Sequence, residues 1–221
     1  MKKNVVETNN IILNKDKLEH QYIYMVLKRF FDIILSLSGL IILLIPCLII
    51  AVFIKLCDGG PVLYTQERVG KDGKRFVIYK FRSMYVNADK LIEKLKEKNE
   101  VSGPMFKMKN DPRITSVGRF LRKTSLDELP QLWNVLIGDM SLVGPRPPLP
   151  KEVAEYSAYD RQRLWVIPGC TGFWQVTERN NVGFEQMVKL DLEYIQRRSL
   201  LFDAKIILMT FRIMVHPNGA Y

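Results

Sequence analysis

A chain of 221 residues is long enough for one domain together with a membrane-associated element. Its lysines and arginines exceed its aspartates and glutamates by ten, which favours anionic lipids, phosphorylated small molecules or nucleic acid as partners, although a role in solubility alone stays open. Three cysteines without CxxC spacing argue against a disulfide scaffold, and only His20 and His216 could serve a zinc site or a histidine-based catalytic triad. Catalysis would therefore have to use carboxylates, cations or a hard metal such as Mg2+.

The N-terminal part of the chain separates into a polar stretch and a long apolar one. Residues 1–20 are polar and without periodicity, so we expect a flexible tail over residues 1–27. From Ile33 to Ile54 no residue is charged. As a helix this stretch would be roughly 33 Å long, against about 30 Å for the hydrocarbon core of a bilayer. A buried core helix is the alternative, and the segment starts too late to be a cleavable signal peptide.

Pro46 interrupts the apolar segment, and its missing N–H predicts a break or a kink. Basic residues flank the segment on both sides, with Lys28 and Arg29 before it and Lys55 after it. Such flanks prefer the cytoplasmic side, which a helix that bends and returns would satisfy at both ends. Segment length favours a straight span instead, so these arguments leave both topologies open.

The remainder of the chain predicts an α+β fold that is mostly helical. Val62–Gln66 and Phe76–Tyr79 read as short strands, and the loop Gly70–Lys74 would join them into a small β-hairpin. Amphipathic patterns predict a surface helix over Asn87–Glu100 and another helix over Glu185–Arg198. The apolar run Leu200–Val215 predicts a helix that either lies in the core or rests in a membrane interface.

The adjacent carboxylates Asp127 and Glu128 are the strongest candidates for chemistry. Ser125 and Glu128 have the spacing of a capping box, whereas a helix starting nearer Asp127 would place Pro130 in a tolerated first turn. Either arrangement puts both carboxylates near the positive end of a helix, which favours their ionised forms. An ionised carboxylate can act as a nucleophile or a metal ligand, although a purely structural cap explains the same spacing.

Basic residues supply candidate phosphate-binding groups. Arg146 stands among three prolines in Gly144–Pro148, and a guanidinium on so restricted a backbone suits phosphate recognition, although a stiff surface connection is the alternative. Taken singly, each further candidate could equally be a solvated surface charge; they are Lys80, Arg82, Arg119, Arg122 and Arg179. Neither a P-loop nor a Gly-x-Gly-x-x-Gly fingerprint occurs, and Trp174 is expected to fill the core.

Several long motifs in a fixed order resemble the bacterial sugar transferases, the monotopic phosphoglycosyl transferases that start glycoconjugate assembly on polyprenol phosphate. The resemblance runs from about Lys28 to Tyr221. It rests on Lys28-Arg29-Phe30-Phe31-Asp32, Gln66-Glu67-Arg68-Val69-Gly70, Tyr79-Lys80-Phe81-Arg82-Ser83-Met84, Leu126-Asp127-Glu128-Leu129-Pro130-Gln131, Gly138-Asp139-Met140-Ser141, Pro145-Arg146-Pro147, Pro168-Gly169 with Thr171-Gly172, and Trp174-Gln175-Val176.

This resemblance implies a monotopic membrane protein of the bacterial inner membrane. A re-entrant helix over residues 28–57, broken at the proline, would enter and leave on the cytoplasmic side and carry a cytoplasmic catalytic domain over residues 58–221. The implied substrates are a UDP-sugar and undecaprenyl phosphate, with Mg2+ as cofactor. The implied reaction transfers a sugar 1-phosphate through an aspartyl-phosphosugar, releases UMP and initiates exopolysaccharide, capsule or other glycoconjugate synthesis.

The resemblance also implies roles for individual residues. Asp127 would be the nucleophile and Glu128 its metal-binding or acid–base companion, with both carboxylates as metal ligands. The phosphates or the uridine end would be held by Lys80, Arg82, Arg122, Arg146 and Arg179. Pro147–Glu152 and the end Gly219–Tyr221 look like the exopolysaccharide branch, which favours a hexose, and Cys170 departs from the aliphatic residue usual at its position.

Two other functions compete with the transferase. A catalytically inactive membrane adaptor of a polysaccharide assembly complex would tolerate the loss of Asp127. A nucleic-acid binder is disfavoured by the uncharged segment and by the lack of interleaved surface aromatics. The sequence leaves the identity of the sugar, the pathway and homo-oligomerisation open.

Overall fold

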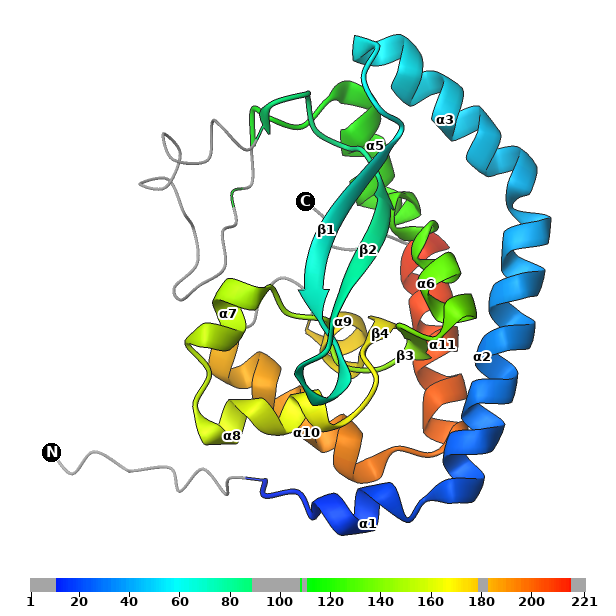
Figure 1. Ribbon diagram of the computed structural model, residues 1–221. Helices are drawn as coiled ribbons and strands as arrows, with labels where there is room; N and C mark the ends of the chain where they lie inside the picture. The colour runs from blue at the N-terminus through cyan, green and yellow to red at the C-terminus, as the bar shows by residue number, and fades with distance from the viewer. Residues whose placement is uncertain (1–10, 89–107, 109–110, 179–182, 216–221) are drawn as a thin grey trace, which may run out of the picture.

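The computed structural model describes residues 11–88, 108, 111–178 and 183–215. Helices α2 and α3 form a long bent arm along one side of the molecule, and the remaining elements pack on its inner side (Figure 1). Helices make up most of the described chain: α1 (Lys15–Glu19), α2 (Tyr22–Ile42), α3 (Leu44–Asp58), α5 (Ser116–Thr124), α6 (Gln131–Ile137), α7 (Pro150–Ala154), α8 (Ala158–Arg161), α9 (Phe173–Thr177), α10 (Phe184–Arg197) and α11 (Leu200–Val215). The strands among the described residues are β1 (Leu63–Val69), β2 (Arg75–Phe81), β3 (Ser141–Val143) and β4 (Gly169–Thr171).

The apolar segment is helical and bent, as Pro46 predicts. Helices α2 and α3 meet at Leu43 at an angle of 60°. Pro46 is the third residue of α3, where its missing N–H leaves the Ile42 carbonyl without its regular helical donor. Among the described helices none is long and apolar enough by itself to cross a membrane, and α2 and α3 meet that test only as a bent pair.

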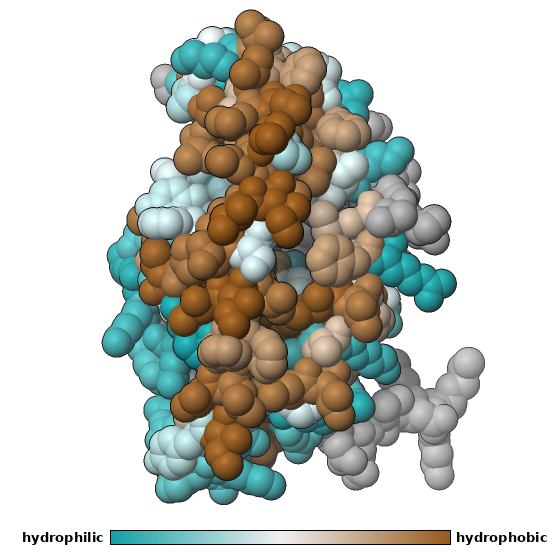
Figure 2. Space-filling model, turned by 90° about the vertical axis from the view of Figure 1, so that its right-hand side faces the viewer, coloured by the Kyte–Doolittle hydropathy of each residue, from teal (hydrophilic) through white to brown (hydrophobic). Residues whose placement is uncertain are grey.

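The bent pair exposes a continuous apolar surface. Figure 2 shows hydrophobic side chains running along this side of the molecule from one end to the other. Large exposed side chains come from both helices and include Phe30, Phe31, Ile34, Ile41, Ile42, Ile45, Ile49, Phe53 and Leu56. A helix in water would turn such a face toward a core, so the alternative of a buried core helix does not fit this arm.

The N-terminal residues differ from the expected tail. Residues 15–19 form α1, and α2 already begins at Tyr22. Leu13 and Leu18 are buried in the main core, and the Leu13 N–H donates to Gln162 Oε1 at 2.7 Å. The described part of the expected tail therefore packs against the domain, whereas residues 1–10 lie outside the described residues.

The predicted hairpin is present, with strands longer than expected. β1 and β2 pair antiparallel from Leu63 opposite Phe81 to Val69 opposite Arg75, and a 3-10 turn over Lys71–Gly73 joins them. The expected helix over residues 87–100 lies almost wholly outside the described residues.

The main core lies between α10, α11 and the short parallel pair β3–β4. Val188, Leu192 and Ile195 of α10 are fully buried, and Ile206 of α11 packs with them. Both C-terminal helices thus appear where the sequence predicts them. Ile206 of α11 faces the core, which agrees with the core alternative, while Leu208 on the same helix is exposed.

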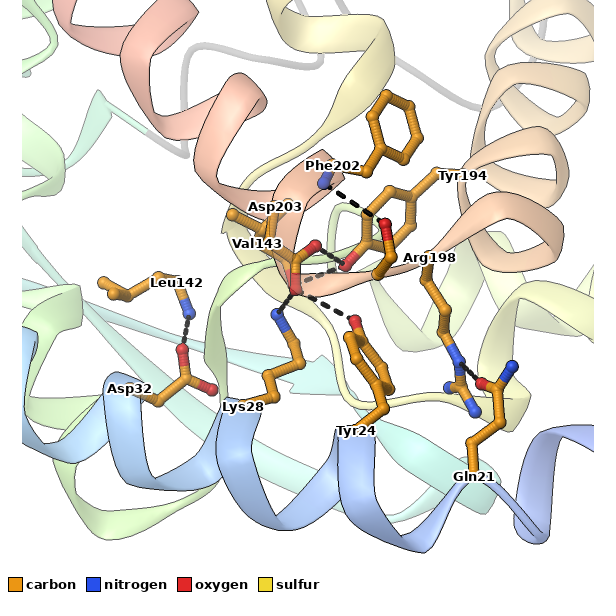
Figure 3. Close-up of polar contacts among 11 residues, drawn as sticks. Gln21, Tyr24, Lys28, Asp32, Leu142, Val143, Tyr194, Arg198, Phe202 and Asp203 are labelled. Atoms are coloured by element: carbon orange, nitrogen blue, oxygen red, sulfur yellow. Dashed lines mark hydrogen bonds and ion pairs between the residues drawn. The ribbon is translucent and has the colours of Figure 1, made fainter.

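A polar junction fixes the base of α2 to this core (Figure 3). The buried Asp203 carboxylate of α11 accepts hydrogen bonds from Lys28 Nζ at 2.8 Å and Tyr24 Oη at 2.9 Å, both on α2. Tyr194 Oη lies 2.7 Å from the other oxygen of this carboxylate. Asp32, one turn farther along α2, accepts from the Leu142 N–H of β3 at 3.0 Å. Polar side chains therefore set the position of the arm relative to β3.

Candidate active site

The acidic pair lies in the connection between two helices. α5 ends at Thr124, and Ser125 takes a left-handed conformation with φ 58°. Asp127 and Glu128 follow in a 3-10 turn over Leu126–Glu128, just before α6 begins at Gln131. The capping box expected at Ser125 is wrong, because its side chain makes no capping hydrogen bond and its backbone terminates α5. The alternative, with Pro130 at the start of the helix, is closer to the structure, since Pro130 is the N-cap of α6.

Strand β2 brings a lysine to the acidic pair. Lys80 Nζ lies 2.6 Å from Glu128 Oε1, and both side chains are only partly exposed. Burial alone would raise the pKa of Glu128, but the Lys80 ammonium, together with Arg146 and Gln131, outweighs it and lowers the pKa below its usual range. Glu128 is therefore held as a carboxylate, which makes it a fixed negative charge beside Asp127.

Asp127 has a different environment although it is the adjacent residue. Its burial, and then the negative charge of Glu128, raise its pKa to about 6, while the cations Lys80 and Arg122 oppose the rise. This direction is opposite to the one that a helix terminus alone predicts. A carboxylate with a raised pKa is more basic and more nucleophilic than a solvated one, and it is still mostly ionised near neutral pH.

A narrow polar pocket opens beside Glu128, between the hairpin and the loops that follow β3 and β4. Arg146 and Lys80 line it, as the sequence predicts. Other lining residues were not singled out as candidates from the sequence: Arg68, Ile78, Gln131, Pro147, Gly169, Cys170 and Gln175. Arg68 is buried, and that burial, together with the nearby Arg146, lowers its pKa to about 10. Two guanidiniums at one pocket favour an anionic ligand.

The other predicted phosphate-binding residues have separate positions. Arg122 of α5 is half-buried and donates through Nε to Ser83 Oγ at 2.9 Å, and its charge acts on Asp127. Arg82 was also expected to bind substrate, but it forms a buried ion pair with Asp58 at the end of α3 and does not line the pocket. Arg179 lies outside the described residues. The structure thus groups Lys80, Arg122 and Arg146 around the acidic pair and assigns Arg82 to the hairpin–arm contact.

The donor set at the acidic pair suits one kind of metal site. No group of three or more His, Cys, Asp or Glu side chains converges anywhere in the described part of the chain. Asp127 and Glu128 offer two adjacent carboxylates next to an anion-binding pocket. Mg2+ is commonly held by one or two carboxylates together with substrate phosphates and water, so these residues fit Mg2+ brought in with a phosphorylated ligand.

Comparison with known proteins shows the family of the chain. The family described as bacterial sugar transferase matches residues 23–217. The chain belongs to the bacterial sugar transferase family. The matched range includes the acidic pair, Lys80 and Arg146.

Relatives of this bacterial sugar transferase are named as a galactosyl transferase, an undecaprenyl-phosphate galactose phosphotransferase and an exopolysaccharide production protein. "Galactosyl transferase CpsE" of Streptococcus agalactiae is 47% identical over 91% of this chain and 45% of its own length. "Undecaprenyl-phosphate galactose phosphotransferase" of Salmonella typhimurium is 46% identical over 88% of this chain and 42% of its own length. "Exopolysaccharide production protein ExoY" of Sinorhizobium fredii is 38% identical over 88% of both chains. The chain therefore spans less than half the length of the first two relatives and most of the third.

Proposed function

We propose that this protein transfers a hexose 1-phosphate from a UDP-sugar to undecaprenyl phosphate. The reaction would release UMP and begin the assembly of an exopolysaccharide, a capsule or another glycoconjugate. The names of the relatives support a lipid carrier and a sugar donor, and family membership supports this type of chemistry. UDP as the carrier of the sugar, the aspartyl intermediate and the release of UMP are parts of the proposal that these three names do not state.

One observation carries the proposal: two adjacent carboxylates lie among cations, with Lys80 Nζ 2.6 Å from Glu128 Oε1, Arg146 in the pocket that Glu128 lines, and Arg122 near Asp127. The pKa of Asp127 is raised to about 6, which suits a nucleophile, while the pKa of Glu128 is lowered by its neighbours after burial is outweighed. Pairs of titratable groups whose environments drive their pKa values apart are typical of catalytic sites. A helix cap would need neither the raised pKa nor the cationic pocket beside it.

In the first step, an oxygen of the Asp127 carboxylate attacks the sugar-bearing phosphorus of the donor. A new P–O bond to Asp127 forms, the bond between this phosphorus and the bridging oxygen breaks, and UMP leaves with the bridging oxygen. Both partners are anions, so their approach is repulsive unless cations neutralise it. Arg122 supplies positive charge near Asp127, and Arg146 supplies it in the pocket.

In the second step, a phosphate oxygen of undecaprenyl phosphate attacks the same phosphorus and displaces the Asp127 carboxylate. The carboxylate is thereby restored, and no proton has to be supplied to either leaving group. Mg2+, held by Asp127, Glu128 and the donor phosphates, would supply further neutralisation of the diphosphate. Two displacements through one covalent carrier predict ping-pong kinetics.

The bent arm suggests where the reaction takes place. We propose that α2 and α3 enter and leave the inner membrane from its cytoplasmic side, with the bend inside the bilayer. The exposed apolar side chains of both helices and the 60° bend support a re-entrant arrangement. Such an anchor would hold the acidic pair near the lipid headgroups, where the acceptor phosphate lies, and so raise its local concentration.

The substitution Asp127→Asn tests the proposal. It keeps the side-chain shape but removes the nucleophilic charge, so UMP release from a UDP-sugar should fall by at least about 1,000-fold. Asp72→Asn, at an exposed carboxylate in the hairpin turn, is the matched control and should keep full activity. A folded Asp127→Asn protein with near-normal UMP release would refute the assignment of the nucleophile. Wild-type protein that released no UMP from any of a panel of UDP-sugars would favour the inactive adaptor.

A further inference from the structure

The segment Pro145–Pro148 is fixed through its carbonyl oxygens. Three of its four residues are prolines, which have no N–H to donate. The hydrogen bonds that fix this backbone therefore come mainly from donors in other segments to its carbonyl oxygens. Each of the four carbonyls accepts one hydrogen bond from a different group: Gly169 N at 2.9 Å to Pro145, Arg163 Nη2 at 3.2 Å to Arg146, Arg68 Nη1 at 3.0 Å to Pro147, and Val69 N at 2.9 Å to Pro148. The backbone that carries the pocket arginine is therefore held at every residue.

The donor to the Arg146 carbonyl is itself part of a buried ion pair. Arg163 and Asp191 are each only 1% exposed at their side chains, and Arg163 Nη2 bonds the Asp191 carboxylate. Arg163 Nη1 donates to Tyr156 Oη at 2.8 Å. The guanidinium thus bridges α10, the end of α7 and the Arg146 backbone.

Stability alone does not account for this pair. Removing two charges from water costs about as much as their attraction returns, and well-packed apolar residues often serve as well in such positions. A guanidinium differs from an apolar replacement because its planar fork fixes the directions of several hydrogen bonds at once. Asp191 neutralises the charge of Arg163, so the Arg146 guanidinium is the cation that the segment Pro145–Pro148 presents to the pocket.

We propose that Arg163, held by Asp191, is a positioning residue for Arg146. Pro145 and Pro147 restrict the backbone on either side, and the bond from Arg163 fixes the plane of the peptide that follows Arg146. The backbone from which the Arg146 side chain reaches the pocket is then fixed by a contact that never touches substrate, while the buried Glu152 carboxylate, 3.8 Å from Arg146 Nη1, holds the guanidinium itself. This inference rests on the proposed function, because it assumes that Arg146 binds a phosphate of the donor.

The double variant Arg163→Met with Asp191→Leu tests the inference by removing the fork while avoiding an unpaired buried charge. Its melting temperature should stay within about 5 °C of wild type, whereas kcat/KM for the UDP-sugar should fall about 10- to 100-fold, because small misplacements of binding groups are costly in rate. The matched control exchanges the exposed pair of the same helix α10, Arg197→Met with Glu193→Leu, and should leave kcat/KM unchanged.

A second variant covers the case in which the double variant does not fold. Arg163→Lys keeps a charge for Asp191, but one ammonium group cannot reproduce the fork to Tyr156 and the Arg146 carbonyl. We expect a folded protein whose affinity for UMP, measured by calorimetry, is about tenfold weaker than that of wild type. Arg163→Lys with unchanged UMP affinity and unchanged kcat/KM would overturn the inference.

A double-mutant cycle separates positioning from a general structural effect. If Arg163 acts through Arg146, then Arg146→Lys should cost about 100-fold in kcat/KM in the wild-type background but only about tenfold or less once the fork has been removed. Equal costs in both backgrounds would show that the two arginines act independently and would overturn the inference. Wild-type protein without UMP release would instead refute the proposed function, so the two failures are distinguishable.

Discussion

Replacing Lys80 with methionine should move the pH dependence of UMP release as well as lower its rate. Lys80 Nζ lies 2.6 Å from Glu128 Oε1, and its charge also opposes the rise in the pKa of Asp127. With a pKa of about 6, the Asp127 carboxyl is about 90% ionised at about pH 7. Without the lysine the pKa should rise further, because burial and the charge of Glu128 both act upward, while Arg122 and a backbone hydrogen bond still oppose them.

The size of the effect follows from these charges. If the pKa of Asp127 rises to about 8, only about one-tenth of the molecules carry the nucleophilic carboxylate at about pH 7, a loss of about tenfold. Loss of the charge-assisted hydrogen bond to Glu128 should cost about another tenfold, the low end of the range for such bonds. We therefore expect a rate about 100-fold below wild type at about pH 7, of which about tenfold returns at about pH 9.

The assay is the first-turnover release of UMP without acceptor lipid, measured from about pH 5 to about pH 9. Arg75→Met is the matched control, because Arg75 lies on the same strand and pairs with Glu67 on the surface. Its profile should coincide with that of wild type. If Lys80→Met lowered the rate by the same factor at every pH, Lys80 would not act on the ionisation of Asp127 and this reasoning would be wrong.

Three further outcomes are expected. Chelation of Mg2+ should abolish turnover. At rising Mg2+ concentration the acid limb of the rate profile should move below pH 6, because a bound cation favours the ionised form of Asp127. An acid limb that does not change with Mg2+ would show that the metal does not act on this carboxylate. Asp203→Asn should lower the free energy of unfolding by about 3 to 5 kcal/mol, since it leaves the Lys28 charge buried without its partner, and a denaturant titration with a loss below about 1 kcal/mol would contradict this. Cysteines placed at the exposed residues 17 and 61 should react with a membrane-impermeant reagent from the same, cytoplasmic side, and labelling of either from outside intact cells would contradict the re-entrant arrangement.

Local patterns predicted much of the fold. Pro46 within an uncharged stretch predicted the bend between α2 and α3, and the glycine-containing loop at residues 70–74 predicted the hairpin. α10 begins and ends within one residue of the predicted helix, because its apolar positions recur with a helical period. Each of these features depends on neighbours in the chain.

Features that depend on distant contacts could not be predicted in this way. Residues 11–19 look like a polar tail, but Leu13 and Leu18 reach a core formed by segments more than a hundred residues away. Ser125 has the spacing of a capping box, but the end of α5 already uses its backbone, which only the preceding helix reveals. Arg82 belongs to a motif with Lys80, yet Lys80 in β2 pairs with Glu128, whereas Arg82, just after the strand, pairs with Asp58.

The sequence pointed to the charged groups that face the pocket but not to the buried groups that hold them in place. The adjacent carboxylates and the arginine among prolines stand out in the sequence, and the structure places Glu128, Lys80 and Arg146 at one pocket. The buried pair of Arg163 and Asp191 gave no local signal, because its members are 28 residues apart and each resembles an ordinary helix charge. A pattern of residue types can reveal groups that face a ligand, but not the groups that hold them.

The proposed mechanism requires a covalent bond between Asp127 and the sugar phosphate. The protein would be incubated with a UDP-sugar and Mg2+ in the absence of acceptor lipid, quenched, digested and analysed by mass spectrometry. We predict that the peptide containing Asp127 gains the mass of one sugar phosphate and loses it when undecaprenyl phosphate is added. An unmodified peptide from a sample that has released a stoichiometric burst of UMP would contradict the central claim.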